Sequence, residues 1–145
     1  MSVQDNKELL KKAAQAFNNI EDRSAWFSFH DDSVQAHGLG LIPGTLDKAG
    51  MTNFYNTLWA GFPDLTLHID DLVGEGDKVV WRVTASGTHN GPFLGLPATG
   101  KAVSFGTQYT FRFANGKIVE RWSNIDRLAL LMQIGIVSLP TPAKK

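Results

Sequence analysis

The spacing of apolar residues changes next to Pro63 in this 145-residue chain. Before this proline, apolar side chains recur at intervals of three and four residues, which is typical of amphipathic helices. After it, they alternate with polar residues, which is typical of strands with one buried face. Helices followed by an antiparallel meander predict an α+β fold.

We expect three helices before the change of period. The first begins near Asp5, because Glu8 lies three residues later, the spacing of a capping box. A short second helix begins at Asp22. The third begins at Thr45 and ends at Pro63, because proline cannot donate a hydrogen bond to the preceding turn.

Strand and turn signals fill the rest of the chain. The expected elements are strand 34–37, loop 38–44, strand 65–69, turn 74–77, strand 78–86, loop 88–101, strand 102–113, strand 117–124 and a closing helix over 128–135. Asn115 and Gly116 favour a two-residue hairpin turn, which places Ala114 opposite Lys117 and gathers the aromatic residues on one face. The members of that face are Phe105, Thr107, Tyr109, Phe111, Phe113, Ile118, Glu120, Trp122 and Asn124. A three-residue loop with a bulge would shift this register by one residue.

Composition excludes several classes of function. Lys plus Arg and Asp plus Glu both number 14, so no basic excess favours nucleic acid or an anionic membrane as a partner. The absence of Cys excludes disulfides, thiolate nucleophiles and cysteine zinc sites. Nine Phe, four Trp and two Tyr indicate an apolar cavity or a large oligomer face. Without an apolar signal segment or a membrane-length run, we expect a cytoplasmic single domain over 1–138, with a flexible tail at 139–145.

A series of short motifs resembles the SnoaL-like polyketide cyclase family. The matching pieces are Phe62-Pro63-Asp64, Gly76-Asp77, Gly87-Thr88-His89-x-Gly91, Thr99-Gly100, Asn115-Gly116-Lys117-Ile118, Glu120-x-Trp122, Asp126 and Gln133-x-Gly135. The resemblance implies the cone-shaped α+β barrel of the NTF2-like superfamily, in which a curved, mostly antiparallel sheet wraps around helices and an apolar pocket. It also implies cofactor-independent ring closure of a polyketide-like ester by an intramolecular aldol reaction, in a homodimer or higher homo-oligomer.

The resemblance makes Asp126 the candidate general acid/base. A carboxyl group can take a proton from the carbon next to a carbonyl and deliver one to the new alkoxide. The spacing Ser123-x-x-Asp126 equally fits a capping box at the start of the last helix. Arg82 interrupts an apolar strand, so it points either outward or inward to pair with Asp126. His37 either stabilises a developing oxyanion or is an ordinary loop histidine.

Further residues are candidates for contact with a substrate. They are His89, Trp122, Glu120, Tyr109, Phe105 and Gln35. The run His30-Asp31-Asp32 superficially resembles a metal cluster, but adjacent side chains point in different directions, so we expect no metal there. The resemblance to the cyclase family implies that no cofactor takes part.

Two alternatives to ring closure stay open. Similarity to limonene epoxide hydrolases places Arg82 and Asp126 at two of their three catalytic positions, while Thr84 replaces the third, an Asp. Gln35 and His37 stand where those enzymes hold water with Tyr and Asn, so epoxide hydrolysis, dehydration or isomerisation in the same pocket is the less favoured alternative. A non-enzymatic module that binds a small apolar molecule is the other, because one fold hosts many functions.

Overall fold

The computed structural model describes residues 1–40 and 43–142 and confirms the α+β prediction. Residues 41–42 of the expected loop 38–44 and residues 143–145 of the expected tail lie outside the described residues. The helices are α1 (Val3–Phe17), α2 (Ala25–Ser28), α3 (Lys48–Gly61) and α4 (Arg127–Gln133). The strands are β1 (His30–His37), β2 (Thr45–Leu46), β3 (Thr66–Glu75), β4 (Lys78–Thr88), β5 (Ala102–Ala114) and β6 (Lys117–Ile125).

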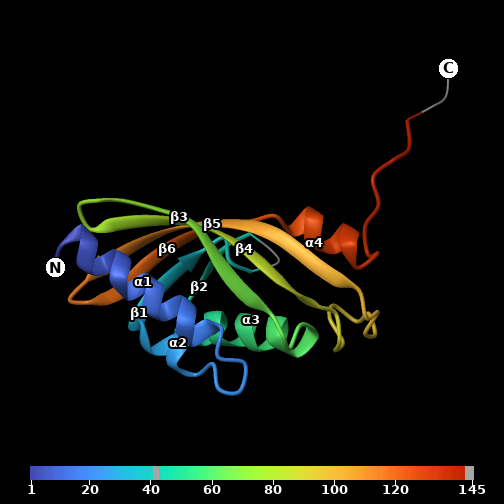
Figure 1. Cartoon of the computed structure of the whole chain (residues 1–145), viewed down its shortest axis with the longest axis horizontal. Coiled ribbons are helices and arrows are strands. Elements are labelled where there is room, and N and C mark those ends of the chain that lie inside the picture. The colour runs from blue at the N-terminus through green and yellow to red at the C-terminus, as the bar shows by residue number, and fades with distance from the viewer. Residues whose placement is uncertain (41–42, 143–145) are drawn as a thin grey trace.

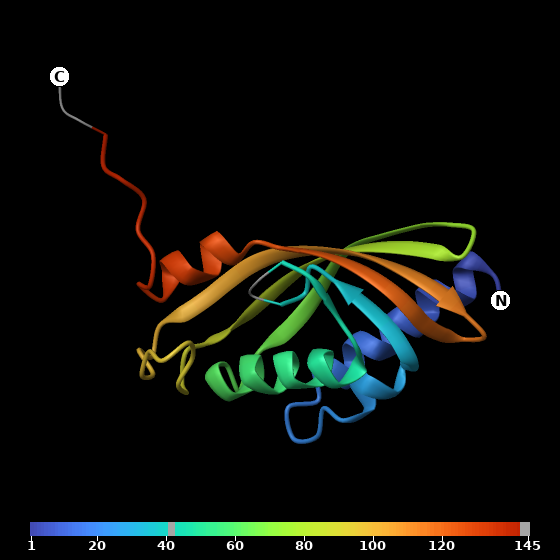
Figure 2. The same cartoon turned by 180° about the vertical axis from the view of Figure 1, so that it is seen from behind.

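The strands form one curved sheet in the order β2-β1-β6-β5-β4-β3 (Figure 1). Neighbouring strands are antiparallel except β1 and β6, which run parallel. The strands β2 and β3 end the order and do not pair with each other, so the sheet is open and does not close into a barrel. Helices α1 and α3 lie across the inner, concave face (Figure 2).

Three helix starts differ from the sequence prediction. Helix α2 begins at Ala25 and not at Asp22, and its N-cap residue Ser24 makes no capping hydrogen bond through its side chain. The other two starts differ in the residue that caps them. Ser2, and not Asp5, caps α1: the Ser2 hydroxyl accepts a hydrogen bond from the Asp5 amide, and the Asp5 carboxylate accepts one from the Ser2 amide, both at 3.0 Å. Asp47 caps α3, because Thr45 belongs to the short strand β2. In both cases another short polar residue nearby offers the capping oxygen.

The β5–β6 hairpin has the predicted turn but also a β-bulge. Ala114 lies opposite Lys117, as expected, and Phe113 lies opposite Ile118. Arg112 then pairs with Glu120, which leaves Val119 as an extra residue on β6. Side chains alternate between faces along a strand, so this one residue exchanges the faces of all that follow.

Because of the bulge, the aromatic face predicted from sequence is wrong for the β6 residues after Ile118. The β5 members and Ile118 face inward, whereas Glu120, Trp122 and Asn124 lie on the outer face. Regular alternation would place Arg121 and Ser123 opposite the aromatic face, but both point into the core with it and are buried. Arg121 is 0% exposed.

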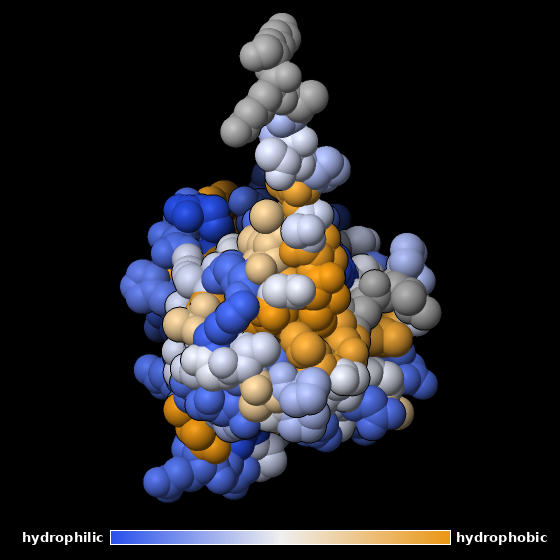
Figure 3. All heavy atoms as spheres, turned by 90° about the vertical axis from the view of Figure 1, so that its right-hand side faces the viewer, coloured by the Kyte–Doolittle hydropathy of each residue, from blue (hydrophilic) through white to orange (hydrophobic). Residues whose placement is uncertain are grey.

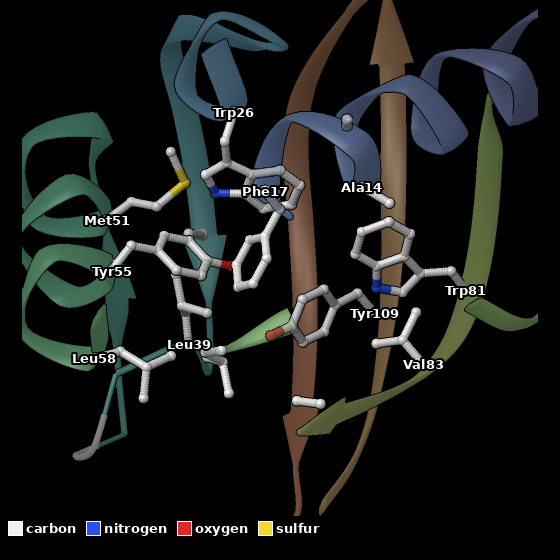
Figure 4. Packing of buried hydrophobic residues seen from close by; sticks show 14 of the residues in the cluster. Ala14, Phe17, Trp26, Leu39, Met51, Tyr55, Leu58, Trp81, Val83 and Tyr109 are labelled. Atoms are coloured by element: carbon white, nitrogen blue, oxygen red, sulfur yellow. The ribbon is translucent and has the colours of Figure 1, made fainter. Parts of the chain in front are cut away.

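Aromatic side chains from both layers fill the space between helices and sheet (Figure 4). Trp26 from α2 stacks on Trp81 from β4 with ring centroids 6.0 Å apart, and Phe17 from α1 packs edge-on against Trp26 at 5.3 Å. Tyr55 from α3 and Tyr109 from β5 project toward each other from opposite sides of this core. Their hydroxyl groups are therefore among the few polar groups in an apolar interior.

The end of the molecule formed by α4, the loop 89–101 and the last turns of α3 carries apolar surface (Figure 3). Leu94, Leu128 and Met132 are exposed there. The loop is held to α3 because the amides of Asn90 and Gly91 both donate to the Gly61 carbonyl, at 3.2 and 3.1 Å. Across the described residues, no helix is both long and apolar enough to cross a membrane.

Candidate functional site

An apolar pocket lies between α3 and the concave face of the sheet, with α4 at one side. Its lining is Phe17, Phe54, Tyr55, Leu58, Leu65, Leu67, Ala85, Phe93, Phe105, Thr107, Tyr109, Ile125, Arg127 and Leu130. We call it the inner pocket. The free space at its centre has a volume of ≈ 30 Å³, and the side chains nearly fill it. A ring-bearing molecule would enter only if side chains of this lining moved apart.

Four polar side chains line the inner pocket. Tyr55 and Tyr109 contribute phenol groups, and Thr107 contributes a buried hydroxyl without a hydrogen-bond partner. Arg127 donates to the carbonyls of Gly38 and Gly40, with an Nη2 to Gly40 oxygen distance of 2.6 Å, and so ties α4 to the loop after β1. No carboxylate or imidazole belongs to the described lining.

Directly behind Tyr55 lies the buried guanidinium of Arg121. Its Nη2 donates to the Tyr55 hydroxyl at 2.6 Å, and its Nη1 donates to Nε2 of His30 at 2.9 Å. The Arg121 Cζ atom lies 4.6 Å from the ring centroid of Tyr109 and 5.1 Å from that of Phe111. Aromatic faces attract the cation, but they do not neutralise its charge.

His30 stays neutral in this environment. Its Nδ1 lies 3.2 Å from the Trp26 carbonyl, which can only accept, so Nδ1 carries the proton and Nε2 accepts from Arg121. Burial, reinforced by the Arg121 charge, lowers the pKa of His30 well below 6.5. Burial also raises the pKa of Tyr55 well above 10.0, although Arg121 opposes this. Tyr55 is therefore a protonated hydrogen-bond donor at neutral pH.

Asp126 and Arg82 lie in a separate groove on the outer face of the sheet, of ≈ 440 Å³. Asp126 is exposed, and its carboxylate accepts from the Ala129 amide at 3.0 Å, so it caps α4. Of the two orientations considered for Arg82, the structure shows the outward one, so Arg82 does not pair with Asp126. Arg82 is outward-facing, because β4 alternates faces, and its nearest carboxylate is Asp70 at 3.8 Å. Thr84 donates to the same carboxylate at 2.6 Å, which helps to lower the pKa of Asp70.

His37 and Glu120 meet on the outer face, not in the inner pocket. Nε2 of His37 lies 2.7 Å from the Glu120 carboxylate, and Nδ1 lies 2.8 Å from the Thr45 hydroxyl. The Glu120 carboxylate also accepts from Arg112 at 3.1 Å, and Trp122 stacks on the His37 ring. The hydrogen bond from His37 lowers the pKa of Glu120 despite partial desolvation.

The remaining predicted contacts divide between the two faces. Phe105 and Tyr109 line the inner pocket. Gln35 is exposed on β1, opposite Glu120 in register. His89 is 0% exposed, and its Nδ1 lies 2.9 Å from the Thr99 hydroxyl, which holds the loop 89–101 closed on itself. In residues 1–40 and 43–142, no group of three His, Asp or Glu side chains is placed to hold a metal ion.

Sequence comparison decides the family. The sequence profile of the SnoaL-like polyketide cyclases matches residues 8–134. The chain belongs to the SnoaL-like polyketide cyclase family. Comparison with curated protein sequences gives no significant match.

Solved structures agree with this family. AclR, a candidate hydroxylase from Streptomyces galilaeus, is 28% identical with a TM-score of 0.86, over 94% of this chain and 100% of that one. IdmH, a candidate polyketide cyclase from Streptomyces antibioticus, is 29% identical with a TM-score of 0.78, over 90% and 98% of the two chains. TsrD from Streptomyces laurentii is 28% identical with a TM-score of 0.78, over 94% and 99%.

Sequence reasoning missed the most unusual polar group of this SnoaL-like chain. Regular alternation places Arg121 on the face opposite the aromatic residues, and the sequence offers His30 only as part of an unconvincing metal cluster or as a residue near a helix end. Tyr55 fitted the apolar stripe of its helix and gave no separate signal. The sequence does hold one signal, because the adjacent residues Glu120 and Arg121 are both charged. Neighbouring side chains of a strand point to opposite faces, so one of these two charges must lie on the buried face.

Proposed function

We propose that the inner pocket of this SnoaL-like protein closes rings in a polyketide-like ester by an intramolecular aldol reaction without a cofactor. The observation that carries this proposal is an aromatic pocket whose polar lining includes two phenol groups, Tyr55 and Tyr109, with a buried cation behind one of them. An apolar wall suits a ring-bearing ligand, and a few placed polar groups orient it.

The phenol groups are suited to the proton movement that ring closure needs. As the enol carbon attacks a ketone, the enol oxygen loses a proton and the new alkoxide oxygen gains one. A phenol hydroxyl is both donor and acceptor, so Tyr55 can pass a proton between these oxygens without net consumption. A donor that already faces the developing oxyanion stabilises the transition state more than the ground state.

Asp126 is the alternative proton carrier, which the family resemblance suggested. Its position in the outer groove and its role as the cap of α4 favour Tyr55 instead. For the same reason we place Arg82 and His37 outside the reacting site. The homo-oligomer that the resemblance implied stays a prediction, which size-exclusion chromatography with light scattering would measure.

The direct test incubates the purified chain with a linear aromatic β-keto methyl ester and follows the cyclised product by chromatography. We expect formation of the ring well above the rate in buffer, with unchanged product yield after dialysis against a metal chelator. Saturable binding of the ester without any ring formation would contradict the proposal and favour the non-enzymatic binding module.

A further inference from the structure

The core of this protein contains a buried positive charge without a negative partner. Arg121 is 0% exposed, and the buried polar and charged residues of the described chain include no Asp or Glu. Every ion pair found among the described residues involves other side chains. An isolated buried charge is costly unless it is compensated, so this arrangement needs an explanation.

The partners of Arg121 are neutral groups that accept hydrogen bonds. They are the His30 imidazole, the Tyr55 hydroxyl and, more weakly, the Met51 sulfur at 3.9 Å. Its Nε has no hydrogen-bond partner in the part of the chain that the structure describes. The guanidinium is thus held in place by dipoles and aromatic faces, and its charge is not cancelled inside the protein.

Tyr55 connects this charge with the inner pocket. Its hydroxyl oxygen accepts from Arg121, and both Tyr55 and Tyr109 line the inner pocket. The two tyrosines project toward each other from opposite sides of the core (Figure 4). Because the oxygen already accepts from a cation, the Tyr55 O–H is polarised and its hydrogen is free to be donated to another acceptor, such as the oxygen of a ligand.

We propose that the inner pocket selects ligands that carry a resonance-stabilised anionic oxygen, an enolate or phenolate, and binds that oxygen through the Tyr55–Tyr109 hydroxyls with Arg121 as the buried counter-charge. This inference rests on the proposed function in placing the ligand in the inner pocket, and it names the chemical class: acidic enols and phenols attached to an otherwise apolar ring system. Low dielectric around the site makes the attraction stronger than it would be in water.

A pair of matched probes tests this without turnover. 4-Nitrophenol ionises near neutral pH and its phenolate absorbs at longer wavelength than the phenol, whereas 4-nitrotoluene has nearly the same shape and cannot ionise. We expect the protein to bind 4-nitrophenol about tenfold or more tightly than 4-nitrotoluene, and to shift the bound 4-nitrophenol toward the phenolate spectrum. Equal binding of both probes, no binding of either, or a bound probe that stays in the phenol form would overturn the inference.

Single-residue variants show which side chains cause the preference for the ionised probe. Arg121→Met should remove the preference and the spectral shift, while Arg82→Met, which removes an arginine from the outer groove, should change neither. If Arg121→Met does not fold, Tyr55→Phe keeps the charge but removes the hydroxyl, and it should lose at least most of the preference. Either variant keeping the full preference would overturn the inference, because a merely structural arginine would not alter the spectrum of the probe.

The outcomes separate this inference from the proposed function. Ring closure without phenolate preference would refute the buried counter-charge and leave the cyclase proposal standing. Phenolate preference without ring closure would support the counter-charge and refute the cyclase proposal.

Discussion

Nη2 of Arg121 on β6 lies 2.6 Å from the hydroxyl of Tyr55 on α3, and both side chains are almost fully buried. This contact links the sheet to the helix layer and places a cation behind the wall of the inner pocket. It exists because the bulge at Val119 turns Arg121 inward.

Deletion of Val119 should be tolerated. Residues 118 and 120 flank the extra residue, so removing it restores regular pairing and leaves Glu120 outside and Arg121 inside. We expect a folded protein whose free energy of unfolding changes by no more than about 2 kcal/mol. Urea unfolding followed by tryptophan fluorescence measures this. In the regular register predicted from sequence, the same deletion would exchange the faces of β6, and the protein would unfold.

The effect of replacing Arg121 on the free energy of unfolding should depend on the shape of the new side chain. Met fills a similar volume and removes an uncompensated charge, so Arg121→Met should retain stability within about 1 kcal/mol or gain it. Arg121→Ala should lose about 2–5 kcal/mol, because it leaves a cavity among the aromatic rings. Thermal and urea unfolding of the two variants would reveal this difference. A loss with Met as large as that with Ala would mean that the charge itself stabilises the fold.

His30 makes stability depend on pH between neutrality and mild acid. Its pKa is lowered in the folded state, so below the ordinary value of 6.5 the unfolded chain binds a proton that the folded chain does not. The free energy of unfolding should therefore fall as the pH falls from 7 to about 5. Gln can also accept from Arg121 and does not titrate, so His30→Gln should flatten this slope. An unchanged slope would show that His30 accepts a proton inside the fold.

The sequence predicts the fold well because its signals are local. The helical stripes, Pro63 and the Asn115–Gly116 turn each act over a few residues, and each has its counterpart in the structure. The site is harder to predict because the bulge at Val119 is a small change of pairing without a strong residue signal. One extra residue moved Glu120 and Trp122 outward and Arg121 inward, so the face calculated from alternation alone was wrong beyond Ile118.

Asp126 shows a second reason why the site is harder to predict from sequence than the fold. A carboxylate at that position satisfies both a capping requirement and a catalytic hypothesis, and burial decides between them. The structure shows an exposed carboxylate on the Ala129 amide. Burial depends on residues such as Gly106 and Arg82, which are distant in sequence and form the same groove.

The location of the chemistry in the inner pocket is tested most directly by comparing ring-closure rates of Tyr55→Phe and Asp126→Ser. Phe keeps the ring and its packing, and Ser keeps the ability to cap α4, so both variants should fold. We predict that Tyr55→Phe lowers kcat/KM for the β-keto ester at least about tenfold, while Asp126→Ser stays within about twofold of the original chain. Loss of turnover in Asp126→Ser with full turnover in Tyr55→Phe would contradict the account and move the reaction to the outer groove.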